Sequence, residues 1–227
     1  MTAQRAAIAL LAALAAGARE PREVSFPTDD GGVVFADAYG EGERAVVLAH
    51  GARFDKESWS KQARALEAEG FRVVALDFRG YGKSKGPGDA EPMSAPLGHD
   101  VLAAVRWLKA NGAKHVYAVG ASMGGGGVAG AVALAPGEIE RMVFLASWPE
   151  RGAAAAKLQG RKLFITARDD RDGTGALRLP RIRAAFERAP EPKRLVLLDG
   201  SAHAQFLFDT DQGDRLLREI EKFLAEP

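Results

Sequence analysis

The chain has 227 residues, of which 47% are hydrophobic and 27% are charged, and its net charge is +1 at pH 7. This length and composition are typical of one soluble globular domain with a sizeable core, and the near-neutral charge excludes a general attraction to nucleic acid or anionic membranes. The chain has no cysteine, which excludes disulfides, thiolate metal ligands and a cysteine nucleophile. Its four histidines show no metal-binding spacing, so no metal site is expected.

Residues 1–18 form a distinct first segment. Arg5 precedes an uncharged run rich in alanine and leucine, and Ala16-Gly17-Ala18 resembles a small-residue cleavage site. This order fits a secretory signal peptide and is too short for a transmembrane helix or a stable membrane anchor. The alternative is an alanine-rich helix packed on the domain. We expect a periplasmic or secreted protein in the first case, a cytoplasmic one in the second, and one domain over residues 19–227.

The remaining chain predicts alternating strands and helices. A hairpin turn at residues 29–32 joins the first two strands, and buried parallel strands are expected as short apolar runs. Strands are predicted at residues 24–27, 33–38, 45–49, 71–76, 116–119, 142–146, 163–166 and 195–198. Helices are predicted at residues 58–68, 99–110, 124–134, 177–187 with a kink at Pro180, and 213–224. This order predicts an α/β fold with a mainly parallel sheet covered by helices on both faces.

One strand-to-helix junction carries the strongest chemical signal. The apolar run of residues 116–119 leads into Gly120-Ala121-Ser122-Met123-Gly124, a Gly-x-Ser-x-Gly pattern followed by a helix of small residues. This is the form of a nucleophile elbow, a turn so tight that its flanking positions must be glycine. The motif alone is weak, so its context must support it. The small residues of the helix are interpreted as a packing requirement against the sheet.

A serine nucleophile at Ser122 needs a base and an acid. In the fold that carries this elbow the chain order is serine, acid, histidine, and His203 is the only histidine after Ser122. The acid should follow the penultimate strand, where the chain offers three aspartates. We favour Asp170, with Asp169 as the second choice, to hold the His203 tautomer.

The oxyanion hole needs two backbone N–H groups near Ser122. Met123 supplies one as the residue after the serine. Ala52 is expected to supply the other from the loop His50-Gly51-Ala52, which follows an early strand. Because His50 precedes the elbow, a structural role in this loop is expected for it.

In these motifs the chain resembles the α/β-hydrolase superfamily over about residues 24–227. The resemblance rests on four elements in order: His50-Gly51-Ala52, the Asp-x-Arg-Gly-x-Gly-x-Ser element of residues 77–84, the elbow, and Gly200-Ser201-Ala202-His203. The first and third look like those of monoacylglycerol-lipase-like and related serine esterases. The second is typical of the superfamily without carrying catalysis, which implies that Ser84 is structural.

The resemblance has one departure. Many members carry a helical cap before the acid strand, but too few residues follow Ser147 here for a cap domain. A shallow, open site is therefore expected, with Trp148, Phe54, Phe206 and Phe208 either as pocket walls or as ordinary core aromatics. Dienelactone-hydrolase-like proteins are also cap-free but use cysteine. Arg53, Arg79 and Arg168 are expected in loops near the site, which would permit an acidic substrate.

The resulting hypothesis is hydrolysis of a carboxylic ester, with Ser122, His203 and Asp170 as the catalytic triad and no cofactor. The expected partner is a small-molecule acyl substrate, and the oligomeric state is open. Alternatives on the same triad are thioester, lactone or amide hydrolysis and perhydrolysis. An alternative of another class is a non-catalytic binding protein with a hydrolase fold.

Overall fold

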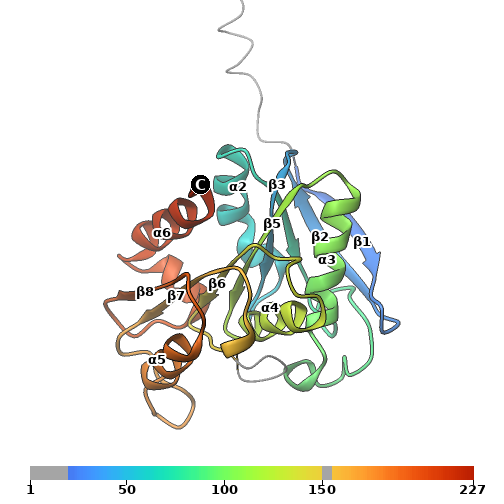
Figure 1. Cartoon of the computed structure of the whole chain (residues 1–227). Coiled ribbons are helices and arrows are strands. Elements are labelled where there is room, and N and C mark those ends of the chain that lie inside the picture. The colour runs from blue at the N-terminus through green and yellow to red at the C-terminus, as the bar shows by residue number, and fades with distance from the viewer. Residues whose placement is uncertain (1–19, 150–154) are drawn as a thin grey trace, which may run out of the picture.

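A computed structural model of the protein describes residues 20–149 and 155–227 (Figure 1). The predicted leader at residues 1–18 lies outside the described residues. Within the described ranges, eight strands form one sheet. They are β1 (Arg22–Pro27), β2 (Val33–Tyr39), β3 (Arg44–Ala49), β4 (Arg72–Leu76), β5 (His115–Ala121), β6 (Arg141–Leu145), β7 (Arg161–Ala167) and β8 (Lys193–Leu198).

The sheet has the order β1-β2-β4-β3-β5-β6-β7-β8. The hairpin β1–β2 is antiparallel and joins β4 in antiparallel fashion, whereas the strands from β4 to β8 pair in parallel. Ala49 at the end of β3 lies beside Gly120 near the end of β5. The loops that follow these two strands therefore leave the sheet next to each other, which is where open α/β sheets form their sites.

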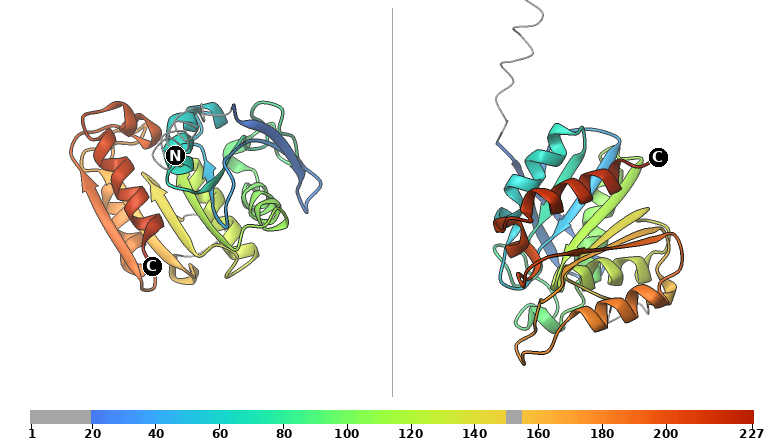
Figure 2. Two further views of the ribbon diagram at one scale, coloured as in Figure 1. Left: turned by 90° about the horizontal axis from the view of Figure 1, so that it is seen from above. Right: turned by 90° about the vertical axis from the view of Figure 1, so that its left-hand side faces the viewer.

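Helices cover both faces of the sheet, as Figure 2 shows. The α-helices of the described residues are α2 (Ser60–Ala68), α3 (Gly98–Ala110), α4 (Met123–Leu134), α5 (Leu179–Arg188) and α6 (Gly213–Ala225). Short 3₁₀ helices are η1 (Lys56–Trp59), η2 (Pro92–Ser94), η3 (Ala155–Lys157) and η4 (Ala204–Asp209). Helices α3, α4 and α5 contribute to one hydrophobic cluster, and α2 and α6 contribute to the other.

The central strands divide their side chains between the two clusters. Along β3, Val47 and Ala49 face the cluster of α3 and α4, whereas Val46 and Leu48 face that of α2 and α6. All four are at most 1% exposed. Because helices cover both faces of this strand, none of these four side chains faces solvent, which explains why its sequence is a continuous apolar run. The predicted α/β fold, with a mainly parallel sheet covered by helices on both faces, is confirmed.

Two predicted helices differ in detail from the structure. The segment predicted as a helix over residues 58–68 starts as the 3₁₀ helix η1 and becomes α-helical at Ser60. The kink predicted at Pro180 is wrong, because α5 begins at Leu179 and the proline lies in its first turn. The backbone nitrogens of a first turn have no acceptor within the helix, so a proline there removes no hydrogen bond.

The connection between β6 and β7 spans only residues 146–160. This length leaves no room for a separately folded cap between the elbow helix and the acid strand, in agreement with the prediction. Among the helices of the described residues, none has the length and apolar character needed to cross a membrane.

Candidate active site

Ser122 lies at the turn between β5 and α4 in a backbone conformation that residues other than glycine rarely adopt, with φ 49° and ψ −114°. The glycines on either side of Ser122 are required because a Cβ at these positions would collide with neighbouring backbone atoms. A Cβ on Gly120 would lie 2.5 Å from the carbonyl oxygen of Gly124, and a Cβ on Gly124 would lie 2.1 Å from that of Ala49. The Ser147 hydroxyl donates to the Ser122 carbonyl at 2.7 Å. The turn is therefore held in its strained form by packing on several sides.

Two hydrogen bonds connect the serine to a histidine and an aspartate. His203 Nε2 lies 2.8 Å from Ser122 Oγ, and His203 Nδ1 lies 2.8 Å from Asp170 Oδ2. The Asp170 side chain is fully buried and that of His203 is 26% exposed. A carboxylate can only accept here, so Nδ1 carries the proton and Nε2 is left to accept from the serine hydroxyl. The sequence left Asp169 as a second choice for the acid. Asp169 is exposed, and the aspartate that contacts His203 is Asp170.

Arg178 is a further contact of Asp170 that the sequence analysis did not find. Its Nε lies 3.4 Å from Asp170 Oδ1, the oxygen that His203 does not use, and its backbone N–H donates to the Asp170 carbonyl at 2.9 Å. The guanidinium places positive charge beside the carboxylate, and the backbone bond fixes the loop that carries it. A run of arginines near the aspartates was visible in the sequence, but nothing distinguished Arg178 among them.

The predicted oxyanion donors follow the ends of the two neighbouring strands β3 and β5. In the hydrogen bonds of residues 20–149 and 155–227, neither Met123 N–H nor Ala52 N–H has an acceptor. Met123 is the first residue of α4, where the partial positive charge of the helix is concentrated. A Cβ on Gly51 would lie 3.4 Å from Ser122 Cβ, so the loop before Ala52 is in contact with the elbow. Two unpaired N–H groups close to the serine are what a developing oxyanion needs.

His50 shapes the Ala52 loop. Its side chain is fully buried, Nε2 accepts from the Phe78 N–H at 3.2 Å, and Nδ1 therefore donates to the Gly51 carbonyl at 2.9 Å. The ring packs edge-on against Tyr81. Burial lowers the pKa of His50 to about 4, so the imidazole is neutral at pH 7. Both nitrogens are used by the backbone, as expected for a structural histidine.

Gln205 joins the Ala52 loop to the His203 loop, a contact missed in the sequence. Gln205 Oε1 accepts from the Gly51 N–H at 2.8 Å, and Nε2 donates to Ser58 Oγ at 2.6 Å. The residue is 4% exposed. No sequence pattern could have indicated this pair, because Gly51 and Gln205 are brought together only by the fold.

The three polar side chains of the Asp-x-Arg-Gly-x-Gly-x-Ser element that give the motif its name, Asp77, Arg79 and Ser84, are buried. Arg79 is fully buried and donates to the carboxylates of both Asp100 and Asp30, and its bond to Asp30 lowers the pKa of that carboxyl to about 2. The expectation that Arg79 lies near a substrate is therefore wrong, because its guanidinium is satisfied inside the protein. Ser84 is also fully buried, and its hydroxyl donates to the Asp77 carbonyl at 2.8 Å.

The four aromatic residues separate into different environments. Phe54, which lies beside Gly51, packs against Phe206 with the rings tilted by 57° and 4.7 Å between their centroids, and the exposed Arg53 lies over Phe206. Trp148 lines a cavity next to Ser122. Phe208 instead packs edge-on against the buried Trp59, so it is a partly buried residue at the border of the core and not a wall of the cavity. The remaining arginine of the expected set, Arg168, is paired with Asp199 at 3.3 Å.

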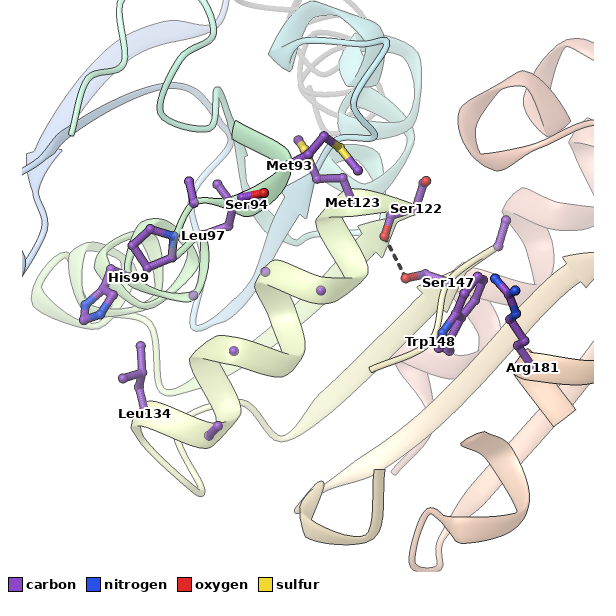
Figure 3. A pocket seen from close by; sticks show the side chains of 18 of the residues that line it. Met93, Ser94, Leu97, His99, Ser122, Met123, Leu134, Ser147, Trp148 and Arg181 are labelled. Atoms are coloured by element: carbon purple, nitrogen blue, oxygen red, sulfur yellow. Dashed lines mark hydrogen bonds between the residues drawn. The ribbon is translucent and has the colours of Figure 1, made fainter. Parts of the chain in front are cut away.

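Ser122 and Met123 open into a cavity of about 820 Å³ (Figure 3). Its lining comes from η2 and the start of α3, from the outer face of α4, and from Trp148 and α5. The sequence predicted a shallow, open site, and the structure adds a groove along α4. No cluster of potential metal ligands occurs among the residues that the structure describes.

Comparisons with known proteins agree with this architecture. The family model described as the alpha/beta hydrolase fold matches residues 44–208. A bifunctional esterase/perhydrolase of Acinetobacter calcoaceticus is 36% identical over 124 residues, 54% of this chain and 44% of the relative. A non-heme chloroperoxidase of Streptomyces lividans is 35% identical over a match of the same extent. The matches thus span less than half the length of these curated relatives.

Solved structures show the same fold at lower identity. An esterase from Pyrococcus furiosus superimposes with a TM-score of 0.72 at 19% identity, covering 91% of this chain and 94% of the other. At this identity the similarity shows the fold alone, so the chemistry is inferred from the residues of the site.

Proposed function

The chain belongs to the alpha/beta hydrolase fold family, and from this premise we propose that it is a serine hydrolase that cleaves carboxylic esters. The observation that carries the proposal is the continuous relay from Ser122 Oγ through His203 to the buried Asp170, with 2.8 Å at each step. A binding protein on this fold has no need of a strained serine joined to a correctly ordered base and acid. Two curated relatives whose names denote an esterase/perhydrolase and a chloroperoxidase support the same class of site.

Acylation starts with proton transfer within the relay. As Ser122 Oγ forms a bond to the ester carbonyl carbon, His203 Nε2 takes the hydroxyl proton and Asp170 stabilises the resulting imidazolium. The carbonyl oxygen becomes an oxyanion and accepts from the N–H groups of Met123 and Ala52. When the tetrahedral intermediate collapses, the ester C–O bond breaks and His203 returns its proton to the leaving alcohol.

Deacylation repeats these steps with water. His203 Nε2 takes a proton from the water whose oxygen attacks the acyl-enzyme carbonyl, and the same two N–H groups bind the oxyanion. The bond between the acyl carbon and Ser122 Oγ then breaks, the carboxylic acid leaves, and the proton returns to Ser122.

The direct test is hydrolysis of p-nitrophenyl esters by wild type and Ser122→Ala. Loss of a triad nucleophile removes up to about 10⁶-fold in kcat, so hydrolysis by Ser122→Ala should fall to background while its melting temperature stays near that of wild type. Ser201→Ala is a matched control, because Ser201 is an exposed serine on the His203 loop. Equal hydrolysis by wild type and Ser122→Ala would contradict the proposal.

The named activities of the relatives favour a second reaction on the same acyl-enzyme. If hydrogen peroxide replaces water in deacylation, its oxygen attacks the acyl carbon, Ser122 leaves with a proton, and a peroxy acid forms. Peroxide-dependent oxidation of a halide or dye in the presence of an acetate ester, absent in Ser122→Ala, would support this activity. Hydrolysis without such oxidation would restrict the protein to esters.

A further inference from the structure

The cavity beside Ser122 is a groove that follows helix α4. Its floor consists of Met123, Gly126, Gly127, Gly130, Ala133 and Leu134, which share the outer face of the helix. As Figure 3 shows, Ser122 and Met123 lie at one end of this floor and Leu134 lies at the other. With 12 residues, α4 is roughly 18 Å long at the rise of an α-helix. Between Met123 and Leu134 the floor carries no side chain larger than a methyl group.

Packing explains most of the glycines in this helix but leaves one unexplained. A Cβ on Gly125 would lie 2.2 Å from Ser147 Oγ, one on Gly127 would lie 2.8 Å from the Phe78 ring, and one on Gly130 would lie 3.0 Å from Gly98 Cα. A Cβ on Gly126, in contrast, would meet nothing within 4 Å. Because alanine is the more stable residue in a helix, glycine at this position gives no benefit to the fold. Its effect is to leave the groove unobstructed.

The walls of the groove carry apolar side chains on both sides, with the Arg181 guanidinium over the Trp148 ring at one edge. Met93 and Leu97 lie along one side and the Trp148 ring lies on the other, as Figure 3 shows. Met93 is 61% exposed, which places an apolar side chain in solvent at the edge of the groove. A chain that lies in the groove would cover these surfaces, and burial of apolar surface is favourable.

The position of His203 assigns the groove to one part of an ester. His203 must reach the leaving alcohol oxygen, so the alcohol departs on the side of His203. Phe206 N–H donates to the His203 carbonyl at 3.2 Å and the Phe206 ring packs against Phe54, so both rings lie on this side. Among the described residues that line the groove, His203, Phe54 and Phe206 are absent, whereas Ser122 and Met123 are present. The groove therefore begins on the other side of the reacting carbon, the side of the acyl group.

We propose that this groove binds the linear, unbranched acyl chain of the substrate, which makes medium-chain acyl esters the preferred class. The inference rests on the proposed ester hydrolysis and adds the substrate class to it. The carbonyl lies at Ser122, the chain extends over Gly126 and Gly130, and its far end reaches toward Leu134. The alcohol part stays outside the groove, so its length should matter little.

The test compares p-nitrophenyl acetate, butyrate and octanoate with wild type, Gly126→Ala and Gly126→Leu. A methylene moved out of water gives up to about fourfold in affinity, so we expect wild type to prefer octanoate over acetate by at least about tenfold in kcat/KM. Gly126→Leu fills the groove floor and should lower this octanoate-to-acetate ratio about tenfold, with Gly126→Ala between. Gly173→Leu is a matched control, because a Cβ there also meets nothing within 4 Å but lies outside the groove.

The outcomes separate the inference from the function on which it rests. Hydrolysis of all three esters with no chain-length preference, or an unchanged preference in a folded Gly126→Leu protein, would overturn the groove assignment alone. No hydrolysis of any ester by wild type would overturn both. A second series with a fixed butyryl group and methyl, butyl or octyl alcohols should show little dependence in wild type, and a steep one would assign the groove to the alcohol instead.

Discussion

The two proposed oxyanion donors are held in place by different means. Met123 N–H is fixed by the backbone itself, because it begins α4 directly after the strained Ser122. Ala52 N–H belongs to a loop that is held by side chains, with His50 bonding to Gly51 and Phe78 and with Gln205 bonding to Gly51. The first arrangement depends on glycines close in sequence, and the second on residues from three distant segments. The two donors should therefore fail in different ways when they are mutated.

The elbow should be the less tolerant of the two. Gly124→Ala places a Cβ 2.1 Å from the Ala49 carbonyl oxygen, a backbone atom that cannot move without shifting β3. We expect a loss of several kcal/mol in unfolding free energy, at the upper end of single substitutions, or failure to fold. Chemical denaturation measures this. A Gly124→Ala protein with wild-type stability would show that the elbow is looser than its geometry implies.

The Ala52 loop should instead respond to pH through His50. Burial lowers the pKa of His50 from 6.5 to about 4, so the unfolded chain binds a proton more readily than the folded protein between these values. His50 therefore contributes stability that is complete above pH 6.5 and is lost as the pH falls toward 4, by about 3 kcal/mol in total. The measurement is the unfolding free energy of wild type minus that of His50→Gln across this range.

A difference between the two proteins is needed because Asp77 acts with the opposite sign. Burial raises its pKa from 3.8 to about 6, so its contribution is present below pH 3.8 and is lost as the pH rises through 6. Subtracting the variant cancels the part of the Asp77 contribution that the two proteins share. Because His50 Nε2 lies 4.0 Å from Asp77 Oδ1, the remaining difference belongs to His50 and its contact with Asp77. A difference that does not change between pH 4 and 6.5 would contradict the buried, neutral state of this residue.

Gln205 should affect the rate more than the fold. Gln205→Leu removes the acceptor of the Gly51 N–H and releases the peptide before Ala52. One oxyanion donor is worth about 3 kcal/mol, so a misplaced Ala52 should lower kcat by about 10- to 100-fold with little change in KM. Gln205→Glu retains an acceptor for Gly51 and should keep more of the rate. Equal losses in both variants would indicate that this bond does not position the loop.

The same contrast explains what the sequence could predict. The elbow at Ser122 is a pattern of adjacent residues, so the sequence alone could identify it. His203 could be identified as the base because it is the only histidine after Ser122 in a fold where the base follows the nucleophile. The structure then joins them by one hydrogen bond. Asp170 could be separated from Asp169 only by burial, which no local pattern reports.

The contacts that the sequence could not supply are those between distant segments. Gln205 meets Gly51 and Arg178 meets Asp170 through the arrangement of loops at the strand ends. Arg79 was expected in a loop near the site, yet its side chain is fully buried and its guanidinium donates to the carboxylates of Asp30 and Asp100. In the sequence Gly126 cannot be distinguished from the neighbouring glycines of α4, because only the structure shows that a Cβ at this position would meet no other atom within 4 Å.

The central claim is that Ser122 is a nucleophile activated by His203, and labelling with a fluorophosphonate tests it most directly. Such a probe phosphonylates only an activated serine, since an ordinary hydroxyl is a weak nucleophile. Peptide mass spectrometry should find one adduct per chain, on Ser122, in wild type, and none in Ser122→Ala or His203→Ala. An unlabelled wild type, or an adduct on another serine, would contradict the account.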